Sequence, residues 1–275
     1  KGNTVYLDDG TIMLEVVKVA PPKIFCEVIR EGRLFSRKGV NVPGAMLHPA
    51  GVPARDKEDV LLGKKLGVDY ISLSFLTSAK DVEQARVLLE GSHTKLIAKI
   101  ESPQALENFD DILKVVDAVM IARGDLGLEI PIEEVPLKQK EIIEKCHIYG
   151  VPVIVATQML ASMMNTLVPT RAEVSDVANA VFDSADTVML SGESASGLYP
   201  VESVRMMRKI IEVSQARSPH DMFQGVPEHL AVNVAVSEAA VETARDVGAK
   251  YIIVGTESGF SARAVAKFRP SVPIM

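Results

Sequence analysis

The chain has 275 residues, of which 47% are hydrophobic and 24% are charged, a balance that is typical of a globular protein and excludes an intrinsically disordered one. Its 36 acidic residues outnumber its 30 basic residues, and the net charge of −6 argues against general binding to nucleic acids or anionic membranes. The two cysteines, Cys26 and Cys146, are too far apart for a clustered zinc motif, and no apolar run approaches the roughly 20 residues of a membrane span. We therefore expect a soluble, cytoplasmic protein.

The first 40 residues are expected to form part of a small all-β module. Strand-like runs lie at 4–7, 11–17 and 23–29. The first two flank Asp8-Asp9-Gly10, and an Asp-Gly pair between two such runs favours a hairpin. Residues 41–53 then link this module to the next unit.

From residue 54 onward, helical and strand-like segments alternate strictly. Helices are expected at 54–67, 78–92, 103–116, 137–150, 170–184 and 200–217. Short Val- and Ile-rich strands are expected between them, at 68–75, 95–101, 118–123, 151–157 and 187–191. Repeated βα units of this length indicate either a Rossmann-like sheet or a (β/α)8 barrel, and five strands would leave a barrel incomplete. We place this unit at 41–218.

A second α/β unit is expected to start at residue 219. Its segments are a helix at 231–247, a strand at 250–255 and a helix at 261–268. The three predicted domains are thus 1–40, 41–218 and 219–275. The chain begins without a methionine and ends in an apolar run, so both ends look cut from structured elements.

Polar residues gather at the carboxyl end of every predicted strand of the central unit. They are Ser72 and Ser74, Lys99 and Glu101, Arg123 and Asp125, Thr157 and Gln158, and Ser191 and Glu193. In parallel α/β folds this carboxyl edge is where ligands bind, because the loops converge there and helix N-termini point towards it. The repetition over five strands is the strongest indication of function in the sequence.

Lys99 and Glu101 are two positions apart in a strand and should point to the same side. They could form an exposed ion pair at the strand end or belong to a binding site. Asp125 lies between Gly124 and Gly127 and could close an ordinary turn or, with Glu101, ligate Mg²⁺ or Mn²⁺. Lysine beside such a metal would neutralise charge on a phosphoryl group or an enolate.

Other polar residues remain open to two interpretations. The Thr157 hydroxyl could contact a substrate or bond the next backbone amide, Arg123 could neutralise charge or be structural, and Glu193 is equally ambiguous. Asp176 and Asn179 are taken as residues of the site edge or of helix packing. The five histidines show no triad spacing, so nucleophilic acyl chemistry has no support.

Taken together, seven stretches resemble the pyruvate kinase family, and the match runs through essentially the whole chain. The stretches are YLDDG (6–10), RKGVNVPG (37–44), KIES (99–102), MIARGDLGLEIP (120–131), VIVATQML (153–160), PTRAEVSDVANAVFDSADTVMLSGESASGLYP (169–200) and TESGFSA (256–262). The resemblance implies an α/β fold: a TIM (β/α)8 barrel, incomplete here, with an inserted small β-barrel domain and the start of a C-terminal α/β domain. It also implies that the first barrel strands are missing.

The implied activity is phosphoryl transfer from phosphoenolpyruvate to ADP, followed by protonation of the enolate to pyruvate. By this resemblance Glu101 and Asp125 match the ligands of Mg²⁺ or Mn²⁺, and Lys99 matches the lysine that stabilises the transferring phosphoryl group. Gly124, Asp125 and Thr157 match substrate contacts, Thr157 on the side where the enolate is protonated. Lys38 matches a contact to the nucleotide phosphates.

The resemblance also implies K⁺, a homotetramer and, in some members, a sugar-phosphate effector. Most K⁺ ligands of the family and a substrate-binding arginine have no counterpart here, and Ser74 falls near the K⁺ site without being predicted as a ligand. The effector loop would comprise Thr256, Ser258, Gly259 and Ser261, whose hydroxyls could hold a phosphate or merely cap the following helix.

Two alternatives stay open at this stage. One is a divalent-metal-dependent aldolase or lyase that acts through a pyruvate enolate, against which the β module and Lys38 argue, because an aldolase needs no nucleotide clamp. The other is that the isolated chain is an inactive fragment or a binding module, since five strands cannot close an eight-stranded barrel.

Overall fold

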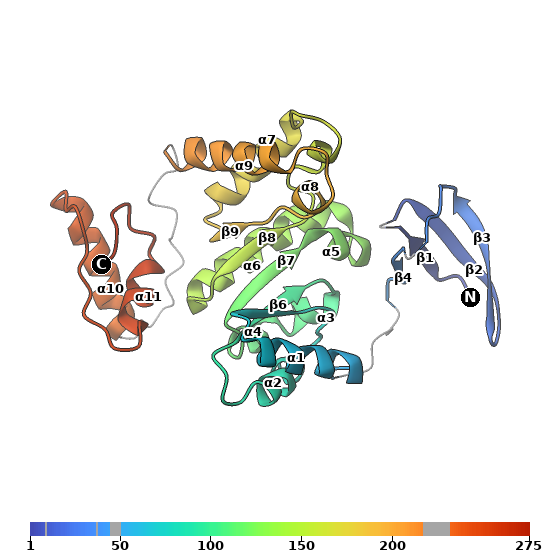
Figure 1. The fold of residues 1–275 in the computed structure, drawn as a ribbon, viewed down its shortest axis with the longest axis horizontal. Coiled ribbons are helices and arrows are strands. Elements are labelled where there is room, and N and C mark those ends of the chain that lie inside the picture. The colour runs from blue at the N-terminus through green and yellow to red at the C-terminus, as the bar shows by residue number, and fades with distance from the viewer. Residues whose placement is uncertain (9, 37, 45–50, 217–231) are drawn as a thin grey trace.

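The computed structural model describes residues 1–8, 10–36, 38–44, 51–216 and 232–275 (Figure 1). Within these ranges the chain forms an antiparallel sheet, a central parallel sheet covered by helices, and a C-terminal helical part (Figure 1). The parallel sheet positions the candidate site.

The first sheet has four strands in the order β3-β2-β1-β4. Their bounds are Thr4–Leu7 (β1), Ile12–Ala20 (β2), Lys23–Arg30 (β3) and Val40–Asn41 (β4). β1 pairs antiparallel with β2, with Leu7 opposite Ile12, so the expected hairpin is confirmed. Position 9 of its turn lies outside the described residues, but the Thr11 amide donates to the Asp8 carbonyl at 3.0 Å.

The central sheet is parallel, and its order β5-β6-β7-β8-β9 follows the sequence. Its strands are Tyr70–Leu73 (β5), Lys95–Ile100 (β6), Ala118–Ala122 (β7), Val153–Ala156 (β8) and Thr187–Val188 (β9). A doubly wound sheet reverses its strand order at a switch point, whereas a barrel adds each strand beside the previous one. The unbroken order therefore decides between the two expected folds in favour of the (β/α) barrel class.

Helices alternate with these strands along the chain as expected and cover one face of the sheet (Figure 1). Their bounds are Ala54–Leu66 (α1), Ala79–Leu88 (α2), Pro103–Glu107 (α3), Phe109–Leu113 (α4), Arg123–Glu129 (α5), Val135–Tyr149 (α6), Arg171–Phe182 (α7), Gly192–Ala195 (α8) and Pro200–Gln215 (α9), with short 3-10 turns at Ile132–Glu134 and Ala161–Met164. α7 begins at a capping box in which the Thr170 hydroxyl accepts from the Glu173 amide and the Glu173 carboxylate accepts from the Thr170 amide.

Two separate clusters of buried residues pack on the two faces of the sheet. Alternate positions of β6, including Leu96 and Ile100, join the large core between sheet and helices. Ile97 lies on the opposite face with Met120 and Ala156. Because side chains alternate along a strand, Lys99 falls on the same face as Ile97, which is the face opposite the helices.

The structure differs from the sequence prediction at two helices. The expected helix 103–116 is divided into α3 and α4 at Asn108, whose side-chain amide donates to the carbonyls of Thr77 and Gln104 and ends the first helix. Arg123 was expected to end a strand, but it begins α5, so Gly124 and Asp125 lie in a helical turn. The ordinary turn that was one alternative for Asp125 is therefore not formed.

The C-terminal part contains Val232–Asp246 (α10) and Phe260–Ala266 (α11). The strand expected at 250–255 is reduced to one parallel bridge between Ile252 and Ile274, because only residues 273–275 run beside it. Polar contacts join this part to the central unit: Arg269 donates to the Asp186 carboxylate at 2.8 Å, and Lys267 donates to the Ile148 carbonyl at 2.7 Å.

No helix within the described ranges is long and apolar enough to cross a membrane.

The position of His147 predicts that the contact between the C-terminal part and the central unit weakens in acid. Its Nε2 atom lies 2.9 Å from the Ser184 carbonyl oxygen and 3.1 Å from a guanidinium nitrogen of Arg269. Burial, and then the charge of Arg269, hold the pKa of His147 below its ordinary value of 6.5. The unfolded chain therefore binds more protons just below pH 6.5, so stability is full above this pH and falls as the pH drops through that window. We expect the melting temperature of the full-length protein to fall between about pH 6.5 and pH 5.

A His147→Gln variant removes the titrating group and should show a flatter dependence of melting temperature on pH. His93 is an exposed histidine, and His93→Gln is the matched control. Equal slopes for wild type and His147→Gln would contradict the prediction.

Candidate functional site

A buried ion pair occupies the carboxyl end of β6. The Lys99 ammonium contacts Oε1 of Glu101 and donates to the Ser74 hydroxyl at 2.9 Å. Glu101 is only 2% exposed, and its second oxygen accepts from the Phe75 amide at 2.7 Å. The alternative of an exposed ion pair is therefore wrong, because the glutamate is fully desolvated.

Burial raises the pKa of Glu101 above its ordinary value, although the Lys99 ammonium and the Phe75 amide act in the opposite direction. The negative charge of Asp125 raises this pKa further, which places the two carboxylates within electrostatic reach of each other. Asp125 is half-buried in the first turn of α5. Two carboxylates that follow neighbouring strands thus lie close enough to interact electrostatically.

This pair fits a divalent metal ion. Oε1 of Glu101 is buried and makes no contact with a donor in the described structure apart from the ion pair with Lys99. The described residues contain no group of three or more His, Cys, Asp or Glu side chains that could enclose a metal. A site of two carboxylates, completed by water or substrate oxygens, is the arrangement that Mg²⁺ prefers.

The loop after β8 is held in an unusual backbone conformation. Thr157 and Gln158 have φ angles of 69° and 55°, in the left-handed region that β-branched residues in particular avoid. Such a conformation costs about 1–3 kcal/mol per residue and persists only where the surroundings fix it. The Thr157 hydroxyl accepts from the Gly124 amide at 2.8 Å, so two of the predicted substrate contacts are joined directly.

The sequence left open whether Arg123 neutralises charge or is structural, and whether Asp176 belongs to the site edge or to helix packing. The Arg123 guanidinium donates to the Asp176 carboxylate at 2.7 Å and to the Thr157 carbonyl at 2.7 Å. Asp176 thus acts in packing against the loop after β8. Asn179, on the same helix, donates only to Ser175 among the bonds of the described structure.

Glu193 has a structural role. It is 2% exposed, and its two oxygens accept from the Leu160 amide at 3.0 Å and from the Ser191 amide at 2.8 Å. The carboxylate therefore ties the loop after β8 to the loop after β9.

Lys38 lies in the antiparallel sheet region and pairs with Asp8 at 2.7 Å. The hairpin of this sheet reaches the central unit at Gly10, where a Cβ atom would lie 2.8 Å from the Leu128 side chain of α5. This contact brings the β module close to the helix that carries Asp125.

The predicted effector loop precedes α11. Gly259 is the N-cap, with a φ of 77°, and no side chain caps the helix. Capping by a loop hydroxyl is therefore not observed. The Ser258 carbonyl instead accepts from Arg263 at 3.2 Å.

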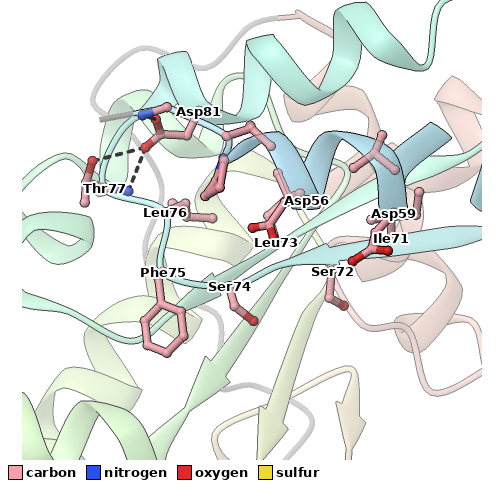
Figure 2. A pocket seen from close by; sticks show the side chains of 14 residues that line it. Asp56, Asp59, Ile71, Ser72, Leu73, Ser74, Phe75, Leu76, Thr77 and Asp81 are labelled. Carbon is pink, nitrogen blue, oxygen red and sulfur yellow. Dashed lines mark hydrogen bonds between the residues drawn. The ribbon is translucent and has the colours of Figure 1, made fainter. Parts of the chain in front are cut away.

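A pocket of about 510 Å³ lies between α1 and the loop after β5 (Figure 2). Ser72 and Ser74 line it, as does Asp81, whose carboxylate accepts from the Thr77 amide and hydroxyl (Figure 2). The pocket adjoins the ion pair at Ser74 but does not contain Lys99, Glu101 or Asp125 among its lining residues.

Sequence reasoning missed the groups that hold the site residues. The Phe75 amide was not considered, although a backbone donor at a strand end is a general feature of this edge. Gln139 and Met159 were also missed, and both contact Arg123. No sequence signal connects them to Arg123, because they lie on other elements.

The order of the parallel strands and the helices around them define a protein of the (β/α) barrel class. The family described as "Pyruvate kinase, barrel domain" matches residues 1–204, and that described as "Pyruvate kinase, alpha/beta domain" matches residues 234–275. The chain belongs to the pyruvate kinase family.

Individual relatives agree with this assignment. A pyruvate kinase of Agrobacterium vitis is 46% identical over 280 residues, covering 100% of this chain and 57% of the relative. One of Sporosarcina psychrophila is 46% identical over 283 residues, covering 100% of this chain and 48% of the relative. The crystal structure of a pyruvate kinase from Cryptosporidium parvum matches with a TM-score of 0.90 and 39% identity, over 99% of this chain and 58% of that one.

The chain spans about half the length of the curated relatives that it matches. Family membership favours a pyruvate kinase over the aldolase or lyase that the sequence left open.

The Glu193 carboxylate predicts a stability effect. Replacing Glu193 with Gln leaves one of the two buried amides without its acceptor, and charge-assisted bonds of this kind contribute about 1.5–3 kcal/mol. We expect the melting temperature of the full-length protein to fall by about 5 °C. Glu212→Gln is the matched control, because Glu212 is an exposed partner of Arg208 and its loss should change stability little. Equal melting temperatures for the two variants would contradict the structural role of Glu193.

Proposed function

We propose that this chain carries the metal-binding and phosphoryl-transfer residues of a pyruvate kinase. The reaction breaks the bond between the phosphorus and the enol oxygen of phosphoenolpyruvate and forms a bond from that phosphorus to a terminal oxygen of ADP. The resulting enolate then takes a proton at its methylene carbon. The observation that carries the proposal is the Lys99–Glu101 pair, with the Asp125 carboxylate within electrostatic range of Glu101, at the carboxyl edge of a barrel-type sheet.

Lys99 supplies positive charge to the transferring group. Its ammonium is part-buried and fixed between Ser74 and Glu101, so it need not reorganise when the substrate binds. Phosphoryl transfer depends mainly on positioning and on charge neutralisation, which suits a rigid cation. Glu101 and Asp125 would hold Mg²⁺ or Mn²⁺, which when bound neutralises charge on the phosphoryl and enolate oxygens.

Thr157 acts on the side where the enolate is protonated. Its hydroxyl oxygen accepts from the Gly124 amide, so its own proton is left to be directed to another acceptor. Gly124, Asp125 and Thr157 line the substrate position together. The substrates would be phosphoenolpyruvate and ADP, with pyruvate and ATP as products.

Further parts of the proposal concern the rest of the protein. Lys38 would contact the nucleotide phosphates, and its present partner Asp8 would be exchanged for them. The domain division is 1–40, 41–218 and 219–275. K⁺, a homotetramer and a sugar-phosphate effector held by the loop 256–261 are proposed from the family, as is a cytoplasmic location.

The first test is a coupled assay of the full-length protein with phosphoenolpyruvate, ADP and Mg²⁺. Full length is needed because β5 and β9 are open edges of the described central sheet. ATP and pyruvate should form in equal amounts. If no ATP forms, the proposed function is refuted.

The second test addresses the metal. Glu101→Gln removes one carboxylate but keeps its size, so the Mg²⁺ concentration for half-maximal activity should rise about 10-fold or more and maximal activity should fall. Glu141→Gln, at an exposed residue paired with Lys138, is the control. An unchanged Mg²⁺ titration in Glu101→Gln would refute the ligand role.

A further inference from the structure

The Arg123 guanidinium lies beside the candidate site, yet all of its donors are already in use. An arginine side chain carries five N–H groups. Nε donates to the Ala156 carbonyl, Nη1 to Gln139 and Asp176, and Nη2 to the Thr157 carbonyl and the Met159 sulfur. No donor is left for a substrate anion, so direct hydrogen bonding to the phosphoryl group is not its role.

Three of the five acceptors of Arg123 belong to the end of β8 and the turn after it. Two of them, the Ala156 and Thr157 carbonyls, are successive backbone groups at the point where the strand enters the left-handed conformation. The bond to Thr157 is 2.7 Å long. The fork of the guanidinium thus fixes the orientation of two peptide units that the chain would not adopt without support.

The next residue along the chain holds the same threonine from its other side. Gly124 donates its amide to the Thr157 hydroxyl at 2.8 Å. Arg123 and Gly124 are consecutive at the start of α5, so a side chain and a backbone amide from adjacent positions contact the carbonyl and the hydroxyl of one residue. These two bonds therefore fix the position of Thr157 relative to the start of α5.

The charge of Arg123 is balanced by a carboxylate on another helix. Its side chain is 10% exposed, and the Asp176 carboxylate on α7 lies 2.7 Å away. Asp176 lies 53 positions further along the chain, so this pair also connects α5 to α7. A buried guanidinium without such a partner would be costly.

We propose that Arg123, oriented by Asp176, is a positioning residue that holds the Thr157–Gln158 turn and thereby sets the Thr157 hydroxyl against the Gly124 amide for protonation of the enolate. This role rests on the proposed function. It assigns to Arg123 no contact with the substrate.

The test uses Arg123→Met in the full-length protein, with Arg86→Met as the matched control. Arg86 makes a similar pair of bonds, to the Val115 carbonyl and to Asp117, at the amino end of β7. In Arg123→Met we expect kcat and the exchange of pyruvate methyl hydrogens with solvent to fall about 10- to 100-fold, with a smaller change in the KM for phosphoenolpyruvate. Arg86→Met should keep both rates. Arg123→Lys should recover less than about tenfold of the lost kcat, because a single ammonium group cannot donate to both carbonyls as the forked guanidinium does.

A double variant separates positioning from an independent effect. In a Thr157→Val background, adding Arg123→Met should lower kcat by less than about threefold, since the group that Arg123 positions is already gone. Losses that multiply in full would overturn the proposal, as would a wild-type kcat in Arg123→Met. If Arg123→Met fails to fold, Asp176→Asn should show a smaller loss with the same split between kcat and KM, and unchanged rates in that variant would overturn the proposal.

Hydrogen exchange tests the positioning role of Arg123 without an activity assay, so its outcome can be told apart from a failure of the proposed function. Hydrogen exchange of the peptide that contains the Gly124 amide should be faster in Arg123→Met than in wild type or Arg86→Met. If the wild-type protein makes no ATP, the proposed function fails, and this exchange still decides whether Arg123 positions the turn. Equal protection in the three proteins would overturn the positioning role.

Discussion

The desolvated carboxylate of Glu101 is the constraint on which the carboxyl edge depends. A buried charge must be compensated by partners, and here one oxygen contacts the Lys99 ammonium while the other accepts from the Phe75 amide. Phe75 itself has a positive φ of 55°, so the backbone after β5 is turned to present this amide. The same two partners draw the ends of β5 and β6 together and keep a cation and an anion side by side at the carboxyl edge of the sheet.

A second constraint acts at the far side of the same edge. The turn at Thr157 is unfavourable locally, and hydrogen bonds from α5 stabilise it. Glu193 adds two more bonds that hold the following loop. Left-handed backbone at both Phe75 and Thr157 is consistent with a functional edge, because strained conformations concentrate where side chains must be aimed rather than packed. Helices on the outer face supply the rigid support, since one continuous apolar core lies between them and the sheet.

Much of this architecture could be predicted from local pattern. The βα alternation, the hairpin and the shared face of Lys99 and Glu101 follow from periods of about 3.6 and 2 residues, which the sequence displays directly. Asp125 was placed on the correct edge but in the wrong element, because two glycines in seven residues favour a turn over a helix. The predicted helix 103–116 missed the break at Asn108 for a related reason: its apolar stripe continues, but the Asn108 side chain finds acceptors on two different elements.

By itself, the sequence determined the class of fold, the edge at which polar residues gather and the family, because these depend on periodicity and on motifs that are contiguous in the chain. The tertiary structure confirmed the barrel that the family resemblance implied, where periodicity alone had left a doubly wound sheet open, and it alone decided the burial of Glu101 and the contacts of Arg123. Those depend on contacts between residues from 16 to 53 positions apart. Such contacts arise when strands and helices pack, and no local preference of the chain encodes which donor meets which acceptor.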